Sequence, residues 1–230
     1  MGHGCGDTAP RNPLAGEDVQ HPGGSRVAKG SKTSVQLRPG QEWQHMHPRR
    51  SPSPSSIRPA ARAEIPKLST LIAAAFAPFE GKVPAIPFGL YVENSCNIGE
   101  RWDEAEVLVA VNGGRIAGTV TFYSDASREQ LGLSADWSGF RTLAVHPAMR
   151  RRGLGRLLVE ECIAKARRLG SPVIGIHTAA FMESACRLYE AMGFVRCPEY
   201  DLLASSLYDF DRAAGDVPVI AYRRDLTSTP

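Results

Sequence analysis

The sequence predicts one α/β domain with a mixed β-sheet over residues 57–230. Three observations indicate this fold class. Short apolar runs of strand length alternate with segments whose apolar residues recur at helical spacing. Two of the strands flank Asn112-Gly113-Gly114, which is a strong hairpin turn. A further strand from Phe140 continues through a glycine-rich turn into a long helix and another strand, which is the order of a βαβ unit.

Local signals predict each element in turn. A first edge strand at 57–60 contains Pro59, which edge strands tolerate. An amphipathic helix covers 63–76, and the Pro- and Gly-rich stretch 78–104 predicts a second short helix or a lid. The remaining predictions are strands at 106–111, 115–123, 140–145, 173–177 and 219–223, a helix at 153–169, a second helix that ends before Gly193, a strand from Phe194, and a loop at 198–217.

The first 56 residues differ from everything after them. Gly, Pro and Ser supply 22 of these 56 residues, and apolar periodicity is almost absent. Such a composition buries too little surface to offset the entropy of ordering, so we expect a disordered tail. The tail carries seven Lys/Arg and four Asp/Glu, which is the whole formal charge of +3. Because these charges are dispersed and Trp43 is the single aromatic residue, an unselected extension is favoured over a nucleic-acid or membrane arm.

Composition excludes several functional classes. No apolar run is long enough to cross a bilayer, and the start lacks the pattern of a signal peptide. The five cysteines are scattered and odd in number, which indicates reduced thiols in a cytoplasmic protein and no metal site. Residues 57–230 contain twenty Lys/Arg and twenty Asp/Glu, so the domain's charge predicts neither nucleic acid nor membrane as a partner. A homodimer is compatible with the sequence without being indicated by it.

Residues 140–156, FRTLAVHPAMRRRGLGR, carry the clearest functional signal. A strand leads into a basic, glycine-rich turn at the start of a helix, where free N–H groups and the helix dipole attract anions. The Walker pattern is excluded because no Gly-Lys-Ser/Thr follows. A dinucleotide fingerprint is excluded because Leu158 stands where its third glycine would be. A phosphate-bearing cofactor is therefore expected, with its pyrophosphate at this turn.

The pattern R-x-x-G-x-G from Arg150 to Gly155, directly after the strand, resembles the acetyl-CoA-binding segment of the GNAT-superfamily N-acetyltransferases. A second segment, MESACRLYEAMGFV at 182–195, resembles the family's late helix-turn-strand, A-x-x-L-Y-x-x-x-G-F. One position departs from the family. Met182 stands where many members have an asparagine that hydrogen-bonds the pantetheine arm, with Ser184 as a nearby substitute. The resemblance covers the chain beyond the tail.

The resemblance implies a fold and a cofactor site. The fold is a mostly antiparallel central sheet of six to seven strands, with helices on both faces and a βαβ cofactor-binding core. The co-substrate is acetyl-CoA, and no metal takes part. Main-chain groups of the strand are implied to hold the pantetheine, the Val145 N–H is implied to face the thioester carbonyl, and the turn is implied to bind the pyrophosphate. The implied cofactor-binding residues are Leu143, Ala144, Val145, Arg150, Arg151, Arg152, Gly153, Leu154, Gly155 and Arg156.

The resemblance also implies one catalytic group. Tyr189 would act as the general acid that protonates the departing thiolate. The alternative is a core tyrosine on the inward face of its helix. The general base stays open among Glu106, Asp136 and His177, and for His177 a structural role with a bond to backbone is favoured.

The expected reaction is direct attack of a primary amine, from a small molecule or a peptide, on acetyl-CoA in a ternary complex. The loop 198–217 contains five acidic residues and one arginine, which is the composition either of a rim that attracts a cationic amine or of an ordinary solvated loop. The alternative function is a non-catalytic acyl-CoA-binding or regulatory module on the same fold, which the residue at Met182 favours.

Overall fold

The computed structural model describes residues 55–227. The tail predicted at 1–56 lies outside the described residues, apart from its last two positions. No helix in the described range is both long and apolar enough to cross a membrane. The helices are α1 (Ile65–Phe76), α2 (Ala85–Cys96), α3 (Leu154–Arg168), α4 (Glu183–Ala191) and α5 (Ala204–Leu207). The strands are β1 (Ser56–Pro59), β2 (Glu106–Asn112), β3 (Arg115–Tyr123), β4 (Ser138–Val145), β5 (Val173–Ala179), β6 (Val195–Arg196), β7 (Leu202–Leu203) and β8 (Pro218–Asp225).

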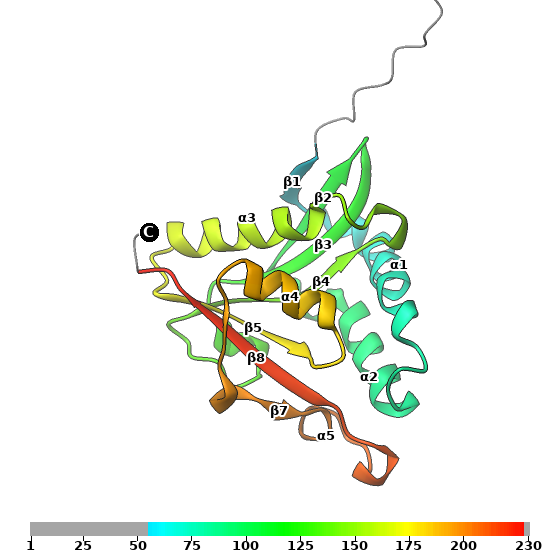
Figure 1. Cartoon of the computed structure of the whole chain (residues 1–230). Helices are drawn as coiled ribbons and strands as arrows, with labels where there is room; N and C mark the ends of the chain where they lie inside the picture. The colour runs from blue at the N-terminus through cyan, green and yellow to red at the C-terminus, as the bar shows by residue number, and fades with distance from the viewer. Residues whose placement is uncertain (1–54, 228–230) are drawn as a thin grey trace, which may run out of the picture. The chain divides into compact units, whose positions relative to one another are not determined.

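One sheet contains all eight of these strands, in the order β1-β2-β3-β4-β5-β8-β6, with β7 also paired to β8 (Figure 1). Every neighbouring pair is antiparallel except β4 and β5, which are parallel and joined through α3. The predicted mixed, mostly antiparallel sheet is therefore confirmed. The strand number is eight rather than six to seven because β6 and β7 are separate strands of two residues each.

The hairpin between β2 and β3 forms as predicted. Gly113 and Gly114 both have positive φ, 58° and 78°, which is the geometry that a two-residue hairpin turn requires. Asn112 pairs with Arg115 across the turn. The turn thereby sets the pairing next to it, and the register of β2 and β3 then shifts by one residue between Ala110 and Val111.

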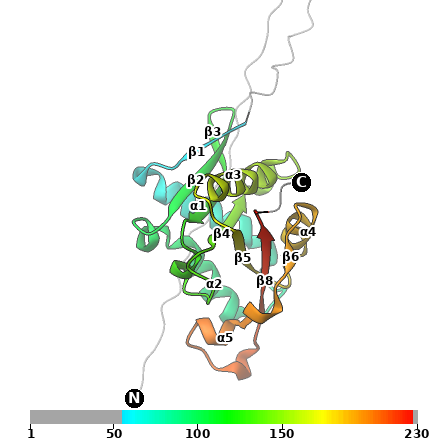
Figure 2. The same ribbon diagram turned by 90° about the vertical axis from the view of Figure 1, so that its left-hand side faces the viewer.

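Helices cover both faces of the sheet, and each face has its own core. Figure 2 shows α3 and α4 on one side of the strands, with α1 and α2 on the other. Leu108 and Ala110 of β2 pack in the core beneath α3, whereas Val107 and Val109 pack against α1. This division follows from the two-residue period of a strand, which sends alternate side chains to opposite faces.

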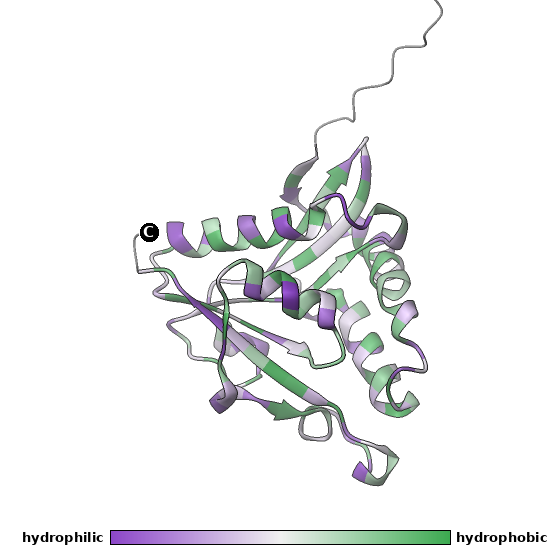
Figure 3. Cartoon of the chain, viewed as in Figure 1, coloured by the Kyte–Doolittle hydropathy of each residue, from purple (hydrophilic) through white to green (hydrophobic). Residues whose placement is uncertain are grey.

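Helix α3 buries the apolar residues that recur at helical spacing in its sequence. Its buried face contains Leu154, Leu158, Cys162 and Ala166, as the apolar spacing predicts. Hydrophilic residues alternate with apolar ones along the helix in Figure 3, so its outer face is polar. The prediction extended the helix to Leu169, but the helix ends at Arg168 and the Leu169 side chain is exposed, because the chain turns out of the helix there.

Candidate functional site

The sheet divides between β4 and β5. The two strands pair only at their start, at Ser138–Ile174 and Gly139–Gly175. Further on, β4 stays paired with β3, whereas β5 runs beside β8. The main-chain groups of residues 143–145 that face β5 therefore have no strand partner in the described part of the chain (Figure 1). An extended ligand with amide groups can bind at such an edge as an added strand does.

A β-bulge lies in β4 just before this free edge. Thr121 pairs with Arg141 and Thr119 with Ala144, so three steps on β4 oppose two on β3. The bulge contains Thr142, whose φ of 55° lies in the left-handed region that β-branched residues rarely adopt. Strained backbone of this kind persists only where the surrounding packing enforces it. Bulges often change the direction of a strand next to an active site.

The turn after β4 presents free N–H groups. Gly153 has φ of 77° and precedes α3, which begins at Leu154. The Leu157 N–H donates to the Gly153 carbonyl at 3.0 Å, and the N–H groups of residues 151–156 have no carbonyl acceptor among residues 55–227. Free N–H groups together with the helix dipole make this end of α3 suited to an anion. A Cβ at Gly153 would meet no atom within 4 Å, so the approach is open.

Most of the predicted cofactor-binding residues lie around this turn. Arg151, Arg152 and Arg156 are exposed beside the free N–H groups. Arg150 differs, because its Nη2 donates to the Ala75 carbonyl at 2.6 Å and its Nε to the Val145 carbonyl at 3.4 Å. The side chains of Ala144 and Leu154 are buried in the two cores, and Gly155 packs against Leu188 of α4. Ala144, Leu154 and Gly155 can therefore contact a ligand only through their main-chain groups.

The sequence decides which family these features belong to. The sequence model of the acetyltransferase (GNAT) family matches residues 74–194, which is more than half of the chain. The chain belongs to the GNAT acetyltransferase family. It is therefore an acetyl-CoA-dependent acetyltransferase.

Solved GNAT structures share the fold. A GNAT-family acetyltransferase from Staphylococcus aureus is 21% identical, with a TM-score of 0.55 over 76% of this chain and 100% of that one. A putative acetyltransferase from Salmonella typhimurium, solved with acetyl-CoA, is 19% identical, with a TM-score of 0.52 over 77% and 97%. The ribosomal-protein-S18-alanine N-acetyltransferase of Escherichia coli is 18% identical, with a TM-score of 0.52 over 76% and 96%. No curated protein matches the chain.

Tyr189, the predicted acid of this GNAT chain, lies on the inner face of α4 and is 2% exposed. Its ring packs against Phe140, Phe194 and Tyr222, with centroid distances of 5.8, 5.9 and 6.1 Å. Burial raises the pKa of Tyr189 well above its usual value, and no hydrogen bond to a described group offsets this rise. The hydroxyl is thus protonated at neutral pH, as a general acid must be. Its catalytic role stays a prediction, because the same contacts also suit a core tyrosine.

Met182 occupies the position of the family's asparagine. It is buried at the start of α4, and its sulfur accepts from the hydroxyls of Tyr91 at 3.9 Å and Thr178 at 3.8 Å. Ser184, the suggested substitute, is exposed. The amide hydrogen bond that other GNAT members make at this position thus has no direct counterpart in Met182.

An inner cavity of about 50 Å³ lies where β4 and β5 part. It is lined from α2, β4, β5 and α5. Three of its lining residues have a buried polar atom without a partner in the described residues: Ser95 Oγ, Thr142 Oγ1 and His177 Nδ1. Buried polar atoms are nearly always hydrogen-bonded, so three of them around one cavity indicate a place for a polar ligand.

His177 makes the backbone bond that the sequence favoured. Its Nε2 lies 2.9 Å from the Tyr200 carbonyl oxygen. Because a carbonyl only accepts, Nε2 must carry a proton, and in the neutral ring Nδ1 then holds a lone pair. Burial lowers the pKa of His177, which favours this neutral form at pH 7. The structural bond therefore leaves a proton acceptor at the inner cavity.

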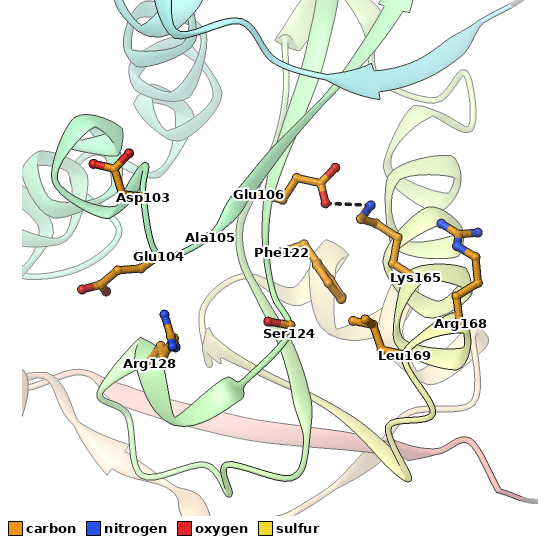
Figure 4. Close-up of a pocket in the computed structure, with 10 residues that line it drawn as sticks. All are labelled: Asp103, Glu104, Ala105, Glu106, Phe122, Ser124, Arg128, Lys165, Arg168 and Leu169. Atoms are coloured by element: carbon orange, nitrogen blue, oxygen red, sulfur yellow. Dashed lines mark ion pairs between the residues drawn. The ribbon is translucent and has the colours of Figure 1, made fainter.

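The other two candidate bases lie elsewhere. Glu106 forms an ion pair with Lys165, 2.6 Å from Oε2 to Nζ, in a surface cleft of about 530 Å³ beside the end of α3 (Figure 4). Asp136 accepts a hydrogen bond from the Ser134 hydroxyl. Neither residue lines the inner cavity. Of the three candidates, the structure brings only His177 to the parting of β4 and β5.

An outer cavity of about 340 Å³ adjoins the inner one, and the two share Leu131, Arg141, Leu207 and Tyr208. Its wall includes Arg101, Glu129 and Arg141. Sequence reasoning missed these three residues. Arg101 follows the irregular stretch after α2 and Glu129 lies in the loop before β4, so neither belongs to a motif.

Glu129 is unusual for a carboxylate. It is 4% exposed, and neither side-chain oxygen has a hydrogen-bond partner within residues 55–227. Burial raises the pKa of Glu129 to about 7, although the positive charges of Arg141 and Arg101 oppose the rise. The carboxyl group is therefore partly protonated near neutral pH.

The acidic residues of loop 198–217 have partners of their own. Asp201 pairs with Arg196 at 2.7 Å, and Asp216 accepts from the Ser205 hydroxyl and lies 3.8 Å from Arg212. These contacts lower the pKa of both aspartates. No cluster of three or more His, Cys, Asp or Glu side chains suited to a metal ion occurs in the range that the structure describes.

Proposed function

We propose that the chain is an N-acetyltransferase, which moves the acetyl group of acetyl-CoA to a primary amine of a small molecule or peptide by direct attack in a ternary complex. The observation that carries the proposal is the parting of β4 from β5. It leaves the 143–145 edge without a strand partner next to the α3 N-terminus, and it opens the inner cavity at the same place. A donor and an acceptor can thus meet without crossing the core.

The chain's main-chain groups fit the donor. Amides of the pantetheine arm would hydrogen-bond Leu143 and Val145, and the Val145 N–H would stabilise charge on the thioester oxygen. The free N–H groups of residues 151–156 would bind the pyrophosphate, with Arg151 and Arg152 adding charge-assisted bonds. The Salmonella structure, which contains acetyl-CoA, supports this use of the shared fold.

Proton transfer would use two side chains from neighbouring elements of the chain, His177 of β5 and Tyr189 of α4. The Nδ1 lone pair of His177 lines the inner cavity and is suited to accept the amine proton. The hydroxyl of Tyr189, which is protonated at neutral pH, would give a proton to the departing thiolate. The E. coli ribosomal-protein-S18-alanine enzyme acts on an amine, which supports nitrogen as the acceptor atom here.

A non-catalytic acyl-CoA-binding or regulatory module on the same fold is the alternative that the sequence alone left open. The buried Met182, in place of the asparagine, favours it, because one ligand to the pantetheine arm is replaced by a thioether. The two candidates differ in one measurable property. Both bind CoA, but only the enzyme consumes acetyl-CoA in proportion to an amine.

The deciding experiment follows CoA release from acetyl-CoA with a pooled panel of amines, together with mass spectrometry of the products. An N-acetyltransferase gives amine-dependent CoA release and a product heavier by one acetyl group. A binding module gives a CoA complex in calorimetry without either signal. Products acetylated on oxygen alone would contradict the assignment to nitrogen.

A further inference from the structure

The outer cavity contains two arginines without an acidic partner. Arg101 is 8% exposed, and its Nη2 donates to the main-chain oxygen of Asn94 at 2.6 Å. Its Nη1 is buried and has no hydrogen-bond partner among the described residues. Arg141 donates from Nη2 to Asn94 Oδ1, also at 2.6 Å. One asparagine thus holds both guanidinium groups beside the same cavity.

The charged groups of this wall are not all paired. The two guanidinium groups are always charged, and they face one carboxyl group, Glu129, that is itself partly protonated. Burial lowers the pKa of Arg101, and repulsion from Arg141 lowers it further. Glu100 and Glu104 also line the cavity and are exposed to water at its rim. Glu100 opposes the lowering of the Arg101 pKa, but neither glutamate forms an ion pair with Arg101 or Arg141.

The third arginine of the wall is already paired. Arg128 lies 3.6 Å from Asp125, and its side chain is half exposed. Arg101 and Arg141 have no comparable ion pair in the described part of the chain. An unpaired buried charge is costly, and a guanidinium fork matches a carboxylate in geometry. The site therefore presents two guanidinium groups without an ion-pair partner in the described residues, which suits a carboxylate.

The position of Arg141 links this charge to the reaction. Arg141 belongs to both cavities, and the next residue is Thr142 of the bulge, whose hydroxyl faces the inner cavity with His177. A ligand whose anionic group binds at Arg141 and Arg101 in the outer cavity would extend into the inner cavity, where the amine reacts. The acceptor's charged group and its amine are thus separated by a short span.

We propose that the acceptor is a small primary amine that also carries a carboxylate, held by Arg101 and Arg141 in the outer cavity. This inference rests on the proposed N-acetyltransferase function, because it places the amine in the inner cavity. An amine without an anionic group leaves the two guanidinium groups unpaired, so it is the poorer acceptor.

The test compares matched ligands on the unaltered protein. The probes are N-acetyl derivatives of α-amino acids, β-alanine and γ-aminobutyrate, each paired with its own carboxamide. Calorimetry on the full chain saturated with CoA measures affinity. The proposal expects at least one carboxylate to bind about tenfold or more tightly than its carboxamide, since a charge-assisted bidentate bond is lost. Equal affinities, or no binding by any probe, overturn it.

Variants locate the effect. Arg141→Gln should remove the preference for the carboxylate, and Arg141→Lys should restore part of it, because lysine keeps the charge without the fork. Arg62→Gln is the matched control, since Arg62 is exposed and its one ion pair within residues 55–227 is with Asp103 at 3.3 Å. A preference that survives Arg141→Gln contradicts the site, and the comparison of ligands on the unaltered protein still applies if the variant does not fold.

A separate assay tests the proposed function on the same preparation. CoA release is measured with each free amino acid and with its carboxamide. If neither amine releases CoA although the carboxylates bind, the N-acetyltransferase function fails and the anion site stands. If both release CoA equally well, the function stands and the carboxylate site fails.

Discussion

The Arg150 guanidinium donates a hydrogen bond to the Ala75 carbonyl oxygen at 2.6 Å, and so ties the end of α1 to the turn before α3. We expect Arg150→Gln to lower the free energy of unfolding by about 1 kcal/mol. Arg152→Gln should leave it within about 0.5 kcal/mol and weaken CoA binding instead. Urea unfolding and calorimetry separate the two effects. If Arg150→Gln weakens CoA binding without a change in stability, the side chain contacts phosphate rather than Ala75.

Gly153 and Gly170 allow a matched test of the pyrophosphate site. They lie at opposite ends of α3, both have positive φ, 77° and 73°, and a Cβ at either position meets no atom within 4 Å. An aspartate at either position therefore carries a similar backbone strain. Gly153→Asp should weaken CoA binding about a hundredfold through charge repulsion at the free N–H groups, whereas Gly170→Asp should not. Equal CoA affinities of the two variants in calorimetry would remove this turn from the site.

The variant Tyr189→Phe distinguishes a catalytic role of Tyr189, as general acid, from a purely structural role in the core. The change keeps the ring against Phe140 and Phe194. If the hydroxyl protonates the thiolate, turnover should fall by about 10²-fold while CoA affinity and melting temperature barely change. The rate of CoA release and the melting temperature, both measured on one preparation, test this expectation. Full turnover by the variant would mean that water is the acid.

His177→Gln tests the base while it keeps the structural bond, because a glutamine N–H can still donate to the Tyr200 carbonyl. Turnover should fall by about 10²-fold with little loss of stability. In the unaltered protein, kcat/KM should fall only as pH drops through a value below the ordinary imidazole pKa of 6.5, because burial lowers the pKa of His177. A profile unchanged in the variant would show that another group takes the proton.

Glu129 predicts a pH dependence of stability. Its pKa of about 7 in the fold lies above the ordinary 4.5, so the folded state binds a proton more tightly than the unfolded chain does. The stability from this proton is complete below the unfolded value and is lost as pH rises through about 7. At alkaline pH, Glu129→Gln should therefore be more stable than the unaltered protein by about 3 kcal/mol at most.

Urea unfolding across this pH range measures the effect of Glu129. The two proteins should converge in acid, and the difference should grow as pH rises. Glu100→Gln, at the exposed rim of the same cavity, is the control and should follow the unaltered protein. Parallel curves for Glu129→Gln and the unaltered protein would mean that Glu129 is ionised throughout.

Elements with local signals were predictable from the sequence, and elements formed by distant pairing were not. The hairpin at Gly113 was predictable because its two glycines meet a backbone requirement of the turn itself. Helix α2 was predicted only as a short helix or a lid, because Pro87 and Gly89 lie inside it. Strand β7 lies in the predicted loop 198–217, since its two residues become a strand only by pairing with β8.

The candidate site divides in the same way. The predicted donor side is nearly contiguous, from Leu143 to Arg156, so one motif was enough to propose it. The two cavities draw on α2, the loop before β4, β4, β5 and α5, and no sequence spacing brings these together. Arg101 and Glu129 become noticeable only through their burial without partners, which a sequence cannot show.

The seam between the two halves of the sheet is short. Four strands lie on one side of it and four on the other, and the backbone bonds that cross it come from two residue pairs at the start of β4. A co-substrate bound in the gap, as proposed, would therefore do more than occupy a site, because it would supply interstrand bonds that β5 does not make with β4. Rigidity across this line would then be a property of the protein together with its co-substrate, rather than of the protein alone.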